Sequence, residues 1–277
     1  MATQRTLLIT GGSRGIGHAV ATQALASGWQ VIAIARHFPA DQNPPHPALT
    51  THCADLAQLD ALPALLRQIL ADHPAIDALL CNAGSGQFGA LEQFSPRQIR
   101  HQLDLNLTSH LLVARALLPH LKRKRSGDLI FLGSEAALRG GRNGSLYCAA
   151  KFALRGFAQA LREECSSSGV RVGIINPGMV ATPFFDNLDF RPGEEPDQHL
   201  TAEDVASAVL LMLNARPGAV IDEINLTPQK RVIHFGRSRG GERREQGGEQ
   251  GGEQRGERRG EQGEEQRGVK REKGSEE

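Results

Sequence analysis

The first 35 residues place two apolar runs and one helical stretch around a glycine-rich turn, and this arrangement most constrains the fold. Thr6–Thr10 and Gln30–Ala35 are short apolar runs, typical of buried strands. Between them, an amphipathic stretch from His18 to about Ser27 is expected to be helical and to stop at Gly28. Two strands joined through a helix in this way form a βαβ unit with parallel strands.

The same alternation continues along the chain. Further strands are expected at Leu49–Cys53, Ile76–Cys81, Asp128–Gly133, Val170–Ile175 and Val220–Leu226. Further helices are expected at Leu59–Asp72, from the Ser95-Pro96 start to about Lys124 in one or two segments, at Leu146–Ser167, and from the Thr201 cap to about Leu213. This order predicts an α/β fold of the Rossmann type: a single domain with a doubly wound, mostly parallel sheet and helices on both faces.

Composition excludes several classes of protein. The formal net charge of +1 argues against a dedicated nucleic-acid binder. Four scattered cysteines, with no close Cys/His cluster and no secretory signal, predict reduced thiols and no metal site. No stretch approaches the ~18 uninterrupted apolar residues of a membrane span. The expectation is a soluble cytoplasmic protein that binds neither nucleic acid nor membrane.

The composition changes sharply near Arg237. From there on, the chain holds almost only Gly, Glu, Gln, Arg and Lys, with eleven basic and eleven acidic residues. We therefore expect a folded domain at 1–235 and a disordered, nearly neutral tail at 236–277. A solubilising extension, a partner-binding arm and the product of a shifted reading frame all remain open for the tail. RNA binding is disfavoured by the balancing glutamates and the missing aromatic residues.

The glycine-rich turn runs Gly11-Gly12-Ser13-Arg14-Gly15-Ile16-Gly17, directly after the first strand. Glycines let a backbone turn tightly and approach a pyrophosphate closely. The helix that follows offers free N–H groups and the positive end of its dipole. A plain tight turn is the alternative, but the position between a strand and a helix favours a dinucleotide site.

The end of the second strand indicates which dinucleotide. An unphosphorylated ribose is usually held by an acid about ~20 residues beyond the glycines. Here the strand ends in Ala35-Arg36-His37 without an acid, and Arg14 lies within the glycine-rich turn. Two guanidinium groups suit a 2′-phosphate, so NADP(H) is favoured over NAD(H). The alternative is that one or both arginines are solvated.

Other candidate ligand-binding residues also follow strand ends. Asp55-Leu56 could close over an adenine ring, or Asp55 could cap the next helix, and both can hold at once. Asn82-Ala83-Gly84 is a run of small residues that suits a ligand close to the backbone. Ser134 and Pro177 follow later strands. Because ligands bind beyond the carboxyl ends of parallel strands, these positions predict one shared site.

Tyr147 and Lys151 lie four residues apart on one expected helix, so they share a face. An ammonium near a phenol lowers a pKa that starts near ~10, which predicts a proton donor and acceptor usable near neutral pH. A solvated surface pair is the alternative. Asn106 is a poor helix-interior residue, so an inward-facing Asn106 needs a reason, with a capping or core hydrogen bond as the alternative.

Taken together, these motifs resemble the short-chain dehydrogenase/reductase family. The matching residues are Thr10-Gly11-x-x-x-Gly15-x-Gly17, Asn82-Ala83-Gly84, Asn106, Ser134, Tyr147-x-x-x-Lys151 and Pro177-Gly178-x-x-x-Thr182. Ser134 precedes Tyr147 by thirteen residues, which is the family's usual spacing. The resemblance covers about residues 5 to 235.

The resemblance implies a catalytic set of Asn106, Ser134, Tyr147 and Lys151. Tyr147 would be the general acid or base, Ser134 would hydrogen-bond the substrate oxygen, Lys151 would hold the nicotinamide ribose and lower the Tyr147 pKa, and Asn106 would place a water in a proton relay. Val180 and Thr182 would hold the carboxamide of the cofactor. The implied cofactor-binding residues are Gly11, Ser13, Arg14, Gly15, Ile16, Gly17, Arg36, Asp55, Leu56, Asn82, Ala83, Gly84, Asn106, Tyr147, Lys151, Pro177, Gly178, Val180 and Thr182.

The implied function is NADPH-dependent interconversion of a carbonyl and a secondary alcohol on a small to medium substrate, by a homodimer or homotetramer. A dinucleotide-binding regulator or scaffold is the alternative. The substrate wall is expected from Gln87 and Phe88, Leu138–Asn143 and Phe184–Phe190. Arg139 and Arg142 could meet a substrate carboxylate or phosphate, or be solvated. The ending Ile221–Gln229 lacks a glycine-rich turn and looks more like the family branch acting on small hydroxy acids and related carbonyls.

Overall fold

A computed structural model of the chain describes residues 4–39 and 46–236. The expected tail lies outside the described residues except for Gly236, so its disorder stays a prediction. None of the described helices has the length and apolar character needed to cross a bilayer.

Within the described residues, seven strands form one sheet in which every neighbouring pair is parallel. The strands are β1 (Thr6–Thr10), β2 (Gln30–Ala35), β3 (Leu49–Cys53), β4 (Ile76–Cys81), β5 (Gly127–Leu132), β6 (Val170–Pro177) and β8 (Glu223–Leu226), in the order β3-β2-β1-β4-β5-β6-β8. The chain adds β2 and β3 on one side of β1 and then crosses to β4 on the other. The order therefore reverses beside β1, where doubly wound sheets bind ligands. The expected fold class is confirmed.

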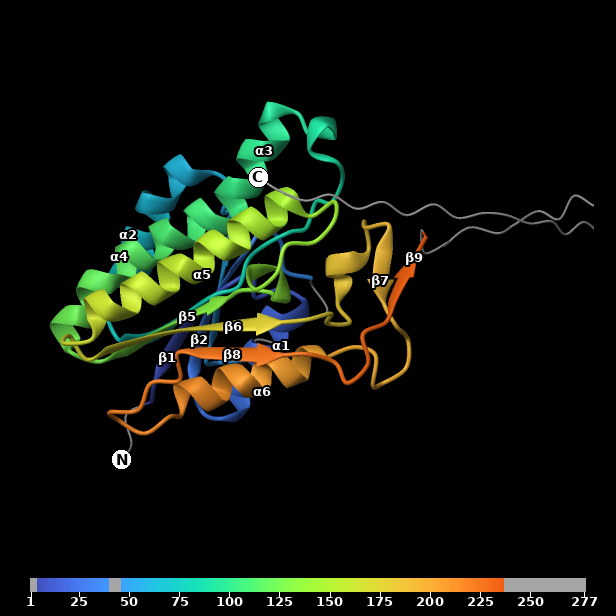
Figure 1. The fold of residues 1–277 in the computed structure, drawn as a ribbon. Helices are drawn as coiled ribbons and strands as arrows, with labels where there is room; N and C mark the ends of the chain where they lie inside the picture. The colour runs from blue at the N-terminus through green and yellow to red at the C-terminus, as the bar shows by residue number, and fades with distance from the viewer. Residues whose placement is uncertain (1–3, 40–45, 237–277) are drawn as a thin grey trace, which may run out of the picture. The chain divides into compact units, whose positions relative to one another are not determined.

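The sheet is covered on both faces (Figure 1). On one face lie α1 (Gly15–Ala26) and α6 (Ala202–Leu213), and on the other lie α2 (Leu62–Asp72), α4 (Ser109–Lys124) and α5 (Ser145–Cys165). Every residue of β1 and β5 is buried, as expected for strands packed on both sides. Leu8 belongs to the core under α2, α4 and α5, whereas Leu7 and Ile9 belong to the core under α1 and α6.

Short elements complete the described part of the chain. α3 (Pro96–Leu103) is capped by Ser95 and joins α4 through a π-helical turn, η4 (Asp104–Thr108). Four 3₁₀ turns are present: η2 (Leu59–Ala61), η3 (Leu91–Gln93), η5 (Glu135–Ala137) and η6 (Pro183–Phe185). β7 (Phe190–Pro192) and β9 (Ile233–Phe235) pair as an antiparallel ribbon beyond the carboxyl ends of β6 and β8 (Figure 1).

Several element boundaries differ from the sequence prediction, and one pair of strands was not expected. α1 begins at Gly15 rather than His18, because the last glycines of the turn already form its first turn. The final sheet strand begins at Glu223 rather than Val220. The β7–β9 ribbon was not anticipated, since three-residue strands carry too little periodicity to be recognised.

Candidate active site

The glycine-rich turn packs so closely that only glycine fits at its key positions. Gly11 has a φ of +73°, and its N–H donates to the carbonyl of Ile34 at 2.7 Å. A Cβ added at Gly17 would lie 2.2 Å from the carbonyl oxygen of Gly11. Arg14 is the N-cap residue of α1 and makes no side-chain capping bond, so no side chain caps the first-turn N–H groups. This cradle therefore fits a phosphate group of a dinucleotide.

Hydrogen bonds tie the end of β4 to the end of β1. The hydroxyl of Thr10 accepts from the backbone N–H groups of Asn82 (2.9 Å) and Ala83 (3.1 Å). The Asn82 amide donates to the carbonyls of Thr10 (2.9 Å) and Gly11 (3.0 Å). The side chain of Asn82 thus holds the glycine-rich turn in shape. Gly84 lies where a Cβ would come within 2.8 Å of Asn106 Oδ1.

The two candidate 2′-phosphate ligands are available at the surface. Arg14 and Arg36 are exposed, and neither pairs with an acidic group among the described residues. Arg36 directly follows β2, the parallel neighbour of β1, so both arginines flank the carboxyl end of β1.

Asp55 adopts a local turn after β3. Its Oδ1 accepts from the backbone N–H of Ala57 at 3.0 Å, and Leu56 beside it is buried. The helical segment that follows has Gln58 and Ala61 as cap residues, so Asp55 does not cap a helix. The helix-cap alternative is therefore wrong, and the adenine contact stays a prediction.

Asn106 occupies the π-helical turn and is fully buried. Its amide donates to the Ser85 carbonyl (3.0 Å) and to the Gln102 side chain (2.7 Å), and its Oδ1 accepts from the Ser85 N–H (3.1 Å). The core hydrogen bond left open by the sequence is thus present. Because Ser85 directly follows Gly84, Asn106 fixes the segment after β4, and π-turns of this kind recur at functional sites.

Ser134 and Tyr147 come together at the carboxyl end of β5. Ser134 caps η5, with its Oγ accepting from the Ala136 N–H at 3.1 Å. The Ser134 hydroxyl lies close enough to the Tyr147 phenol to lower its pKa. Tyr147 lies in the first turn of α5 and is only 8% exposed. Ser134 and Tyr147 are therefore near each other, as expected from their thirteen-residue spacing.

Lys151 lies one turn further along α5 and is buried. Its Nζ donates to the backbone carbonyl of Leu132 at 2.7 Å and lies 5.7 Å from the ring centroid of Tyr147. Burial lowers the pKa of Lys151 to about 8.

The pKa of the Tyr147 phenol moves opposite to the sequence expectation. Burial raises it to about 12, and the nearby Ser134 hydroxyl offsets only part of this effect. The expected lowering by Lys151 is wrong for this arrangement, because its ammonium is directed to the Leu132 carbonyl and desolvation of the phenol dominates.

His110 is a buried polar residue that the sequence analysis did not single out. It lies one helical turn after Asn106, and its Nε2 is 2.8 Å from the Ala83 carbonyl. Burial lowers its pKa to about 3, and the positive charge of Lys151 acts in the same direction. His110 is therefore neutral and donates a hydrogen bond from Nε2 to Ala83, which gives the segment after β4 a second support besides Asn106. The sequence feature that could have indicated this residue is a histidine within the apolar first half of α4.

The residues after β6 lie across from the glycine-rich turn. A Cβ at Gly15 would come within 3.5 Å of the Thr182 side chain, so Thr182 faces this turn. Val180 is buried and forms an isolated bridge with Leu200, while the N–H of Gly178 donates to the Leu226 carbonyl at 2.8 Å. The structure thus places the Pro177–Thr182 segment beside the cradle, as expected.

Part of the expected substrate wall also meets Tyr147. The rings of Phe88 and Phe184 lie 5.3 and 5.9 Å from the Tyr147 ring, centroid to centroid. Arg139 and Arg142 are exposed and form no ion pair within the described residues, which is the solvated alternative.

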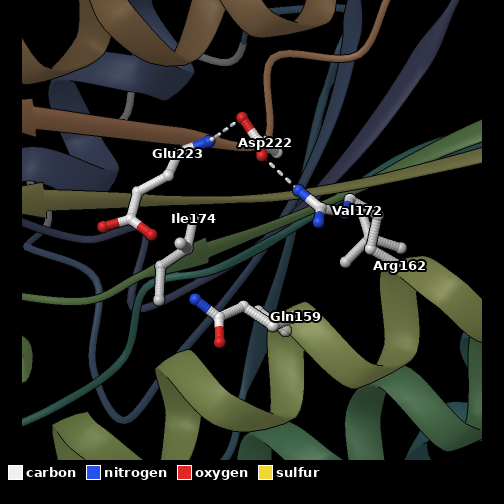
Figure 2. A pocket seen from close by; sticks show the side chains of 7 residues that line it. Gln159, Arg162, Val172, Ile174, Asp222 and Glu223 are labelled. Carbon is white, nitrogen blue, oxygen red and sulfur yellow. Dashed lines mark hydrogen bonds and ion pairs between the residues drawn. The ribbon is translucent and has the colours of Figure 1, made fainter.

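A separate small pocket lies between α5 and the β6–β8 edge of the sheet (Figure 2). It is lined by Ala158, Gln159, Arg162, Val172, Ile174, Asp222 and Glu223, and Arg162 forms an ion pair with Asp222 across its mouth. Its volume of about 60 Å³ accommodates a few water molecules and is far below the ≈ 300 Å³ of the smallest typical ligand sites. It is therefore not a candidate substrate site.

A Rossmann-type sheet, a phosphate cradle at the reversal of strand order, and a serine–tyrosine pair beside a buried lysine define a class of dinucleotide-dependent oxidoreductases. The short chain dehydrogenase family model matches residues 5–191. The chain therefore belongs to this family, whose members are oxidoreductases that bind NAD or NADP.

Individual relatives are similar over most of the chain. Sepiapterin reductase from Chlorobaculum tepidum is 30% identical over 235 residues, which cover 80% of this chain and 95% of that protein. The 17-beta-hydroxysteroid dehydrogenase type 1 of Mus musculus is 30% identical over 253 residues, which cover 84% of this chain and 74% of that protein. The solved structure of an alcohol dehydrogenase from the archaeon Thermococcus sibiricus, in complex with 5-hydroxy-NADP, matches with a TM-score of 0.73 at 25% identity, covering 83% and 99%.

Proposed function

We propose that the protein is an NADPH-dependent reductase that interconverts a carbonyl and a secondary alcohol, with Tyr147 as general acid and base. The observation that carries this proposal is the proximity of Ser134 to Tyr147, with Lys151 buried on the same face of α5. All three groups stand at the carboxyl edge of the sheet, beyond β5.

The two hydroxyl groups suit the charge that develops in such a reaction. The nicotinamide of a bound cofactor supplies or accepts the hydride. When the carbonyl carbon is reduced, negative charge develops on its oxygen, and the Ser134 and Tyr147 hydroxyls can both donate to that oxygen. A Tyr147 pKa of about 12 keeps the phenol protonated at neutral pH, so its proton is available for transfer to the product.

We assign the cofactor to the cradle formed by the glycine-rich turn. The first turn of α1 lacks a side-chain cap, and Gly17 has no room for a side chain, which together suit a pyrophosphate. Arg14 and Arg36 are exposed cations without acidic partners among the described residues, and they suit a 2′-phosphate. The structure of the Thermococcus sibiricus relative contains 5-hydroxy-NADP, which supports the preference for NADP(H).

Lys151 and Asn106 take supporting roles in this proposal. We infer that Lys151, protonated for the most part at neutral pH with a pKa of about 8, holds the nicotinamide ribose. Asn106 holds the segment after β4 and places a water next to Lys151. The homodimer or homotetramer implied by the family resemblance stays part of the proposal.

Oxidation of NADPH against a panel of ketones and aldehydes tests the function. Full-length protein should turn over at least one class of carbonyl compound, and Tyr147→Phe should lower kcat by about 10²–10⁴-fold. This variant removes only the hydroxyl, so the ring contacts with Phe88 and Phe184 should persist.

NADPH binding by fluorescence titration provides the control. Tyr147→Phe should bind NADPH with nearly unchanged Kd, which separates loss of the proton donor from loss of the fold. Tight NADPH binding by the wild-type chain without turnover of any compound would instead support the regulator or scaffold alternative.

A further inference from the structure

Half of the ten phenylalanines in the chain gather around Tyr147. We call them the phenylalanine cluster: Phe88 after β4, Phe184 and Phe185 in η6, Phe190 in β7 and Phe235 in β9. These segments lie outside the seven-stranded sheet, so the cluster is not part of the core that stabilises the fold.

The rings form a connected chain of edge and tilted contacts that begins at Tyr147. Phe88 lies 5.3 Å from the Tyr147 ring and 4.9 Å from Phe190, where the two planes are nearly perpendicular at 89°. Phe184 lies 5.9 Å from Tyr147 on a second side. Aromatic pairs favour such offset and edge-to-face arrangements.

The cluster approaches the backbone as closely as the atoms allow. A Cβ at Gly86 would lie 2.6 Å from the Phe88 ring and 2.7 Å from the Phe184 ring. Tyr147 is 8% exposed under these rings. A substrate carbonyl that reaches the Tyr147 hydroxyl would therefore have its substituents beside the Phe88 and Phe184 rings.

Two arginines near the cluster are already paired with acidic side chains. Arg231 is the basic residue that reaches the Ser134 side, and it is bound to Glu135 at 3.2 Å. Arg191, next to Phe190, is bound to Glu194 at 2.7 Å. A carboxylate in contact with the rings alone would lose its water without gaining a partner from them, which is unfavourable.

We propose that the phenylalanine cluster makes the enzyme selective for carbonyl compounds whose carbonyl carries a flat aromatic ring, such as aryl alkyl ketones. This inference rests on the reductase function proposed above and specifies its substrate class. An aromatic substituent restores the edge-to-face contacts that it displaces, whereas a saturated ring or chain restores only contact area. The hydroxy-acid branch suggested by the ending Ile221–Gln229 is correspondingly disfavoured.

Three ketones with equal numbers of carbon atoms separate aromaticity from size: acetophenone, cyclohexyl methyl ketone and 2-octanone. Pyruvate serves as the keto-acid comparison. With full-length protein and NADPH, kcat/KM for acetophenone should exceed that for each of the others by about tenfold or more. Equal or higher kcat/KM for the saturated ketones or for pyruvate would overturn the proposal.

Substitutions within and outside the phenylalanine cluster test whether the cluster causes the preference for aromatic ketones. Phe190→Leu and Phe88→Leu should each reduce the ratio of kcat/KM between acetophenone and cyclohexyl methyl ketone by about threefold or more, since one edge contact is lost. Phe152→Leu, which changes an exposed phenylalanine of α5, should leave that ratio unchanged. An equal change in all three variants would contradict a role for the cluster.

A binding measurement keeps the proposal testable even if the proposed reaction is wrong. Calorimetric titration in the presence of NADP⁺ compares 1-phenylethanol with 1-cyclohexylethanol, which differ only in the ring. Tighter binding of 1-phenylethanol supports the inference whether or not turnover is found. Equal binding or a preference for the saturated alcohol overturns it, while the function is judged separately by turnover.

Discussion

The ammonium of Lys151 donates to the backbone carbonyl of Leu132, the last residue of β5, at 2.7 Å. This bond joins α5 to the strand that leads into Ser134, so the helix that carries Tyr147 and the turn that carries Ser134 are held together. Lys151 has no acidic side chain as a partner among the described residues, and burial lowers its pKa to about 8. The site therefore contains a positive charge that is costly to bury.

This arrangement predicts how stability depends on pH in the alkaline range. Lys151 has a folded-state pKa of about 8 and an ordinary value of 10.5, so the unfolded chain binds more protons between these values. The contribution of Lys151 to the free energy of unfolding should thus increase by about 1.4 kcal/mol per pH unit from pH 8 to 10.5. Burial also raises the pKa of the Cys81 thiol, which lowers stability above about pH 9 in both proteins. In urea denaturation at several pH values, the difference in free energy of unfolding between the wild type and Lys151→Met should therefore change by the Lys151 contribution.

Lys122→Met is the matched control, because it removes a lysine from the last turn of α4 instead. The free energy of unfolding of Lys122→Met should depend on pH in the same way as that of the wild type. If Lys151→Met and the wild type had parallel pH profiles, Lys151 would not be the buried charge described here.

His110 predicts the same direction of pH dependence in the acid range. Its folded-state pKa of about 3 lies below its ordinary value of 6.5, so the unfolded chain binds more protons between these values. The wild-type chain should lose stability as the pH falls below about 6.5, at about 1.4 kcal/mol per pH unit from this residue. His110→Gln, which keeps a neutral hydrogen-bond donor, should lose less between pH 6.5 and 4.5 in thermal or urea unfolding.

His101→Gln offers the control for this experiment. His101 is an exposed residue of α3, so its replacement should leave the acid profile of the wild type unchanged. A His110→Gln profile identical to that of the wild type would show that His110 is not buried in its neutral form.

Gly17 predicts a sharp effect on cofactor binding. In Gly17→Ala the new Cβ would lie 2.2 Å from the Gly11 carbonyl oxygen and 2.6 Å from the Asn82 amide, and backbone cannot move aside cheaply. NADPH affinity should fall by about tenfold or more, with a loss of about 1–3 kcal/mol in stability. Fluorescence titration and chemical denaturation measure the two effects.

Gly156→Ala is the matched glycine replacement within a helix. No atom lies within 4 Å of the added Cβ, and Gly156 lies inside α5. Alanine should raise stability by about 0.5–1 kcal/mol and leave the NADPH Kd unchanged. Equal effects of the two substitutions would mean that the close contact at Gly17 is not present.

The position of Arg36 after β2 leads us to expect that this residue contributes to a preference for NADPH over NADH. Arg36→Asp removes a cation from the end of β2 and introduces an acid where a ribose 2′-hydroxyl would be bound. The Kd for NADPH should increase by about tenfold or more, and the Kd for NADH should change less. Titration of both cofactors measures the ratio, and equal effects on both would refute the assignment to a 2′-phosphate.

Most of the sheet could be predicted from the sequence because its central strands, such as β1 and β5, are buried on both faces and therefore read as apolar runs. Thr6–Thr10 and Ile76–Cys81 have the same limits in the structure as in the prediction. Thr201 and Ser95 cap their helices as expected, since the capping bonds depend only on residues within the same turn.

The surroundings of Tyr147 could not be predicted in the same way. Phe88, Phe190 and Phe235 are far apart in the sequence, and no local pattern indicates that their rings meet. The direction of the Tyr147 pKa shift also depends on burial of the phenol in the folded chain, which the spacing to Lys151 does not report. The proximity of Ser134 and Tyr147 was predictable because their spacing matches a known family.

The π-helical turn between α3 and α4 has a consequence for how this segment tolerates changes in length. A π-turn corresponds to an α-helix with one inserted residue, and each α-helical residue advances by about 100° around the axis. The wider turn absorbs this extra residue, so deleting one residue within Asp104–Thr108 would give a regular α-helix in which α3 and α4 keep nearly the same faces. Asn106 bonds to Ser85 from within this turn, so a deletion there would disturb these bonds and leave the turn after β4 unsupported.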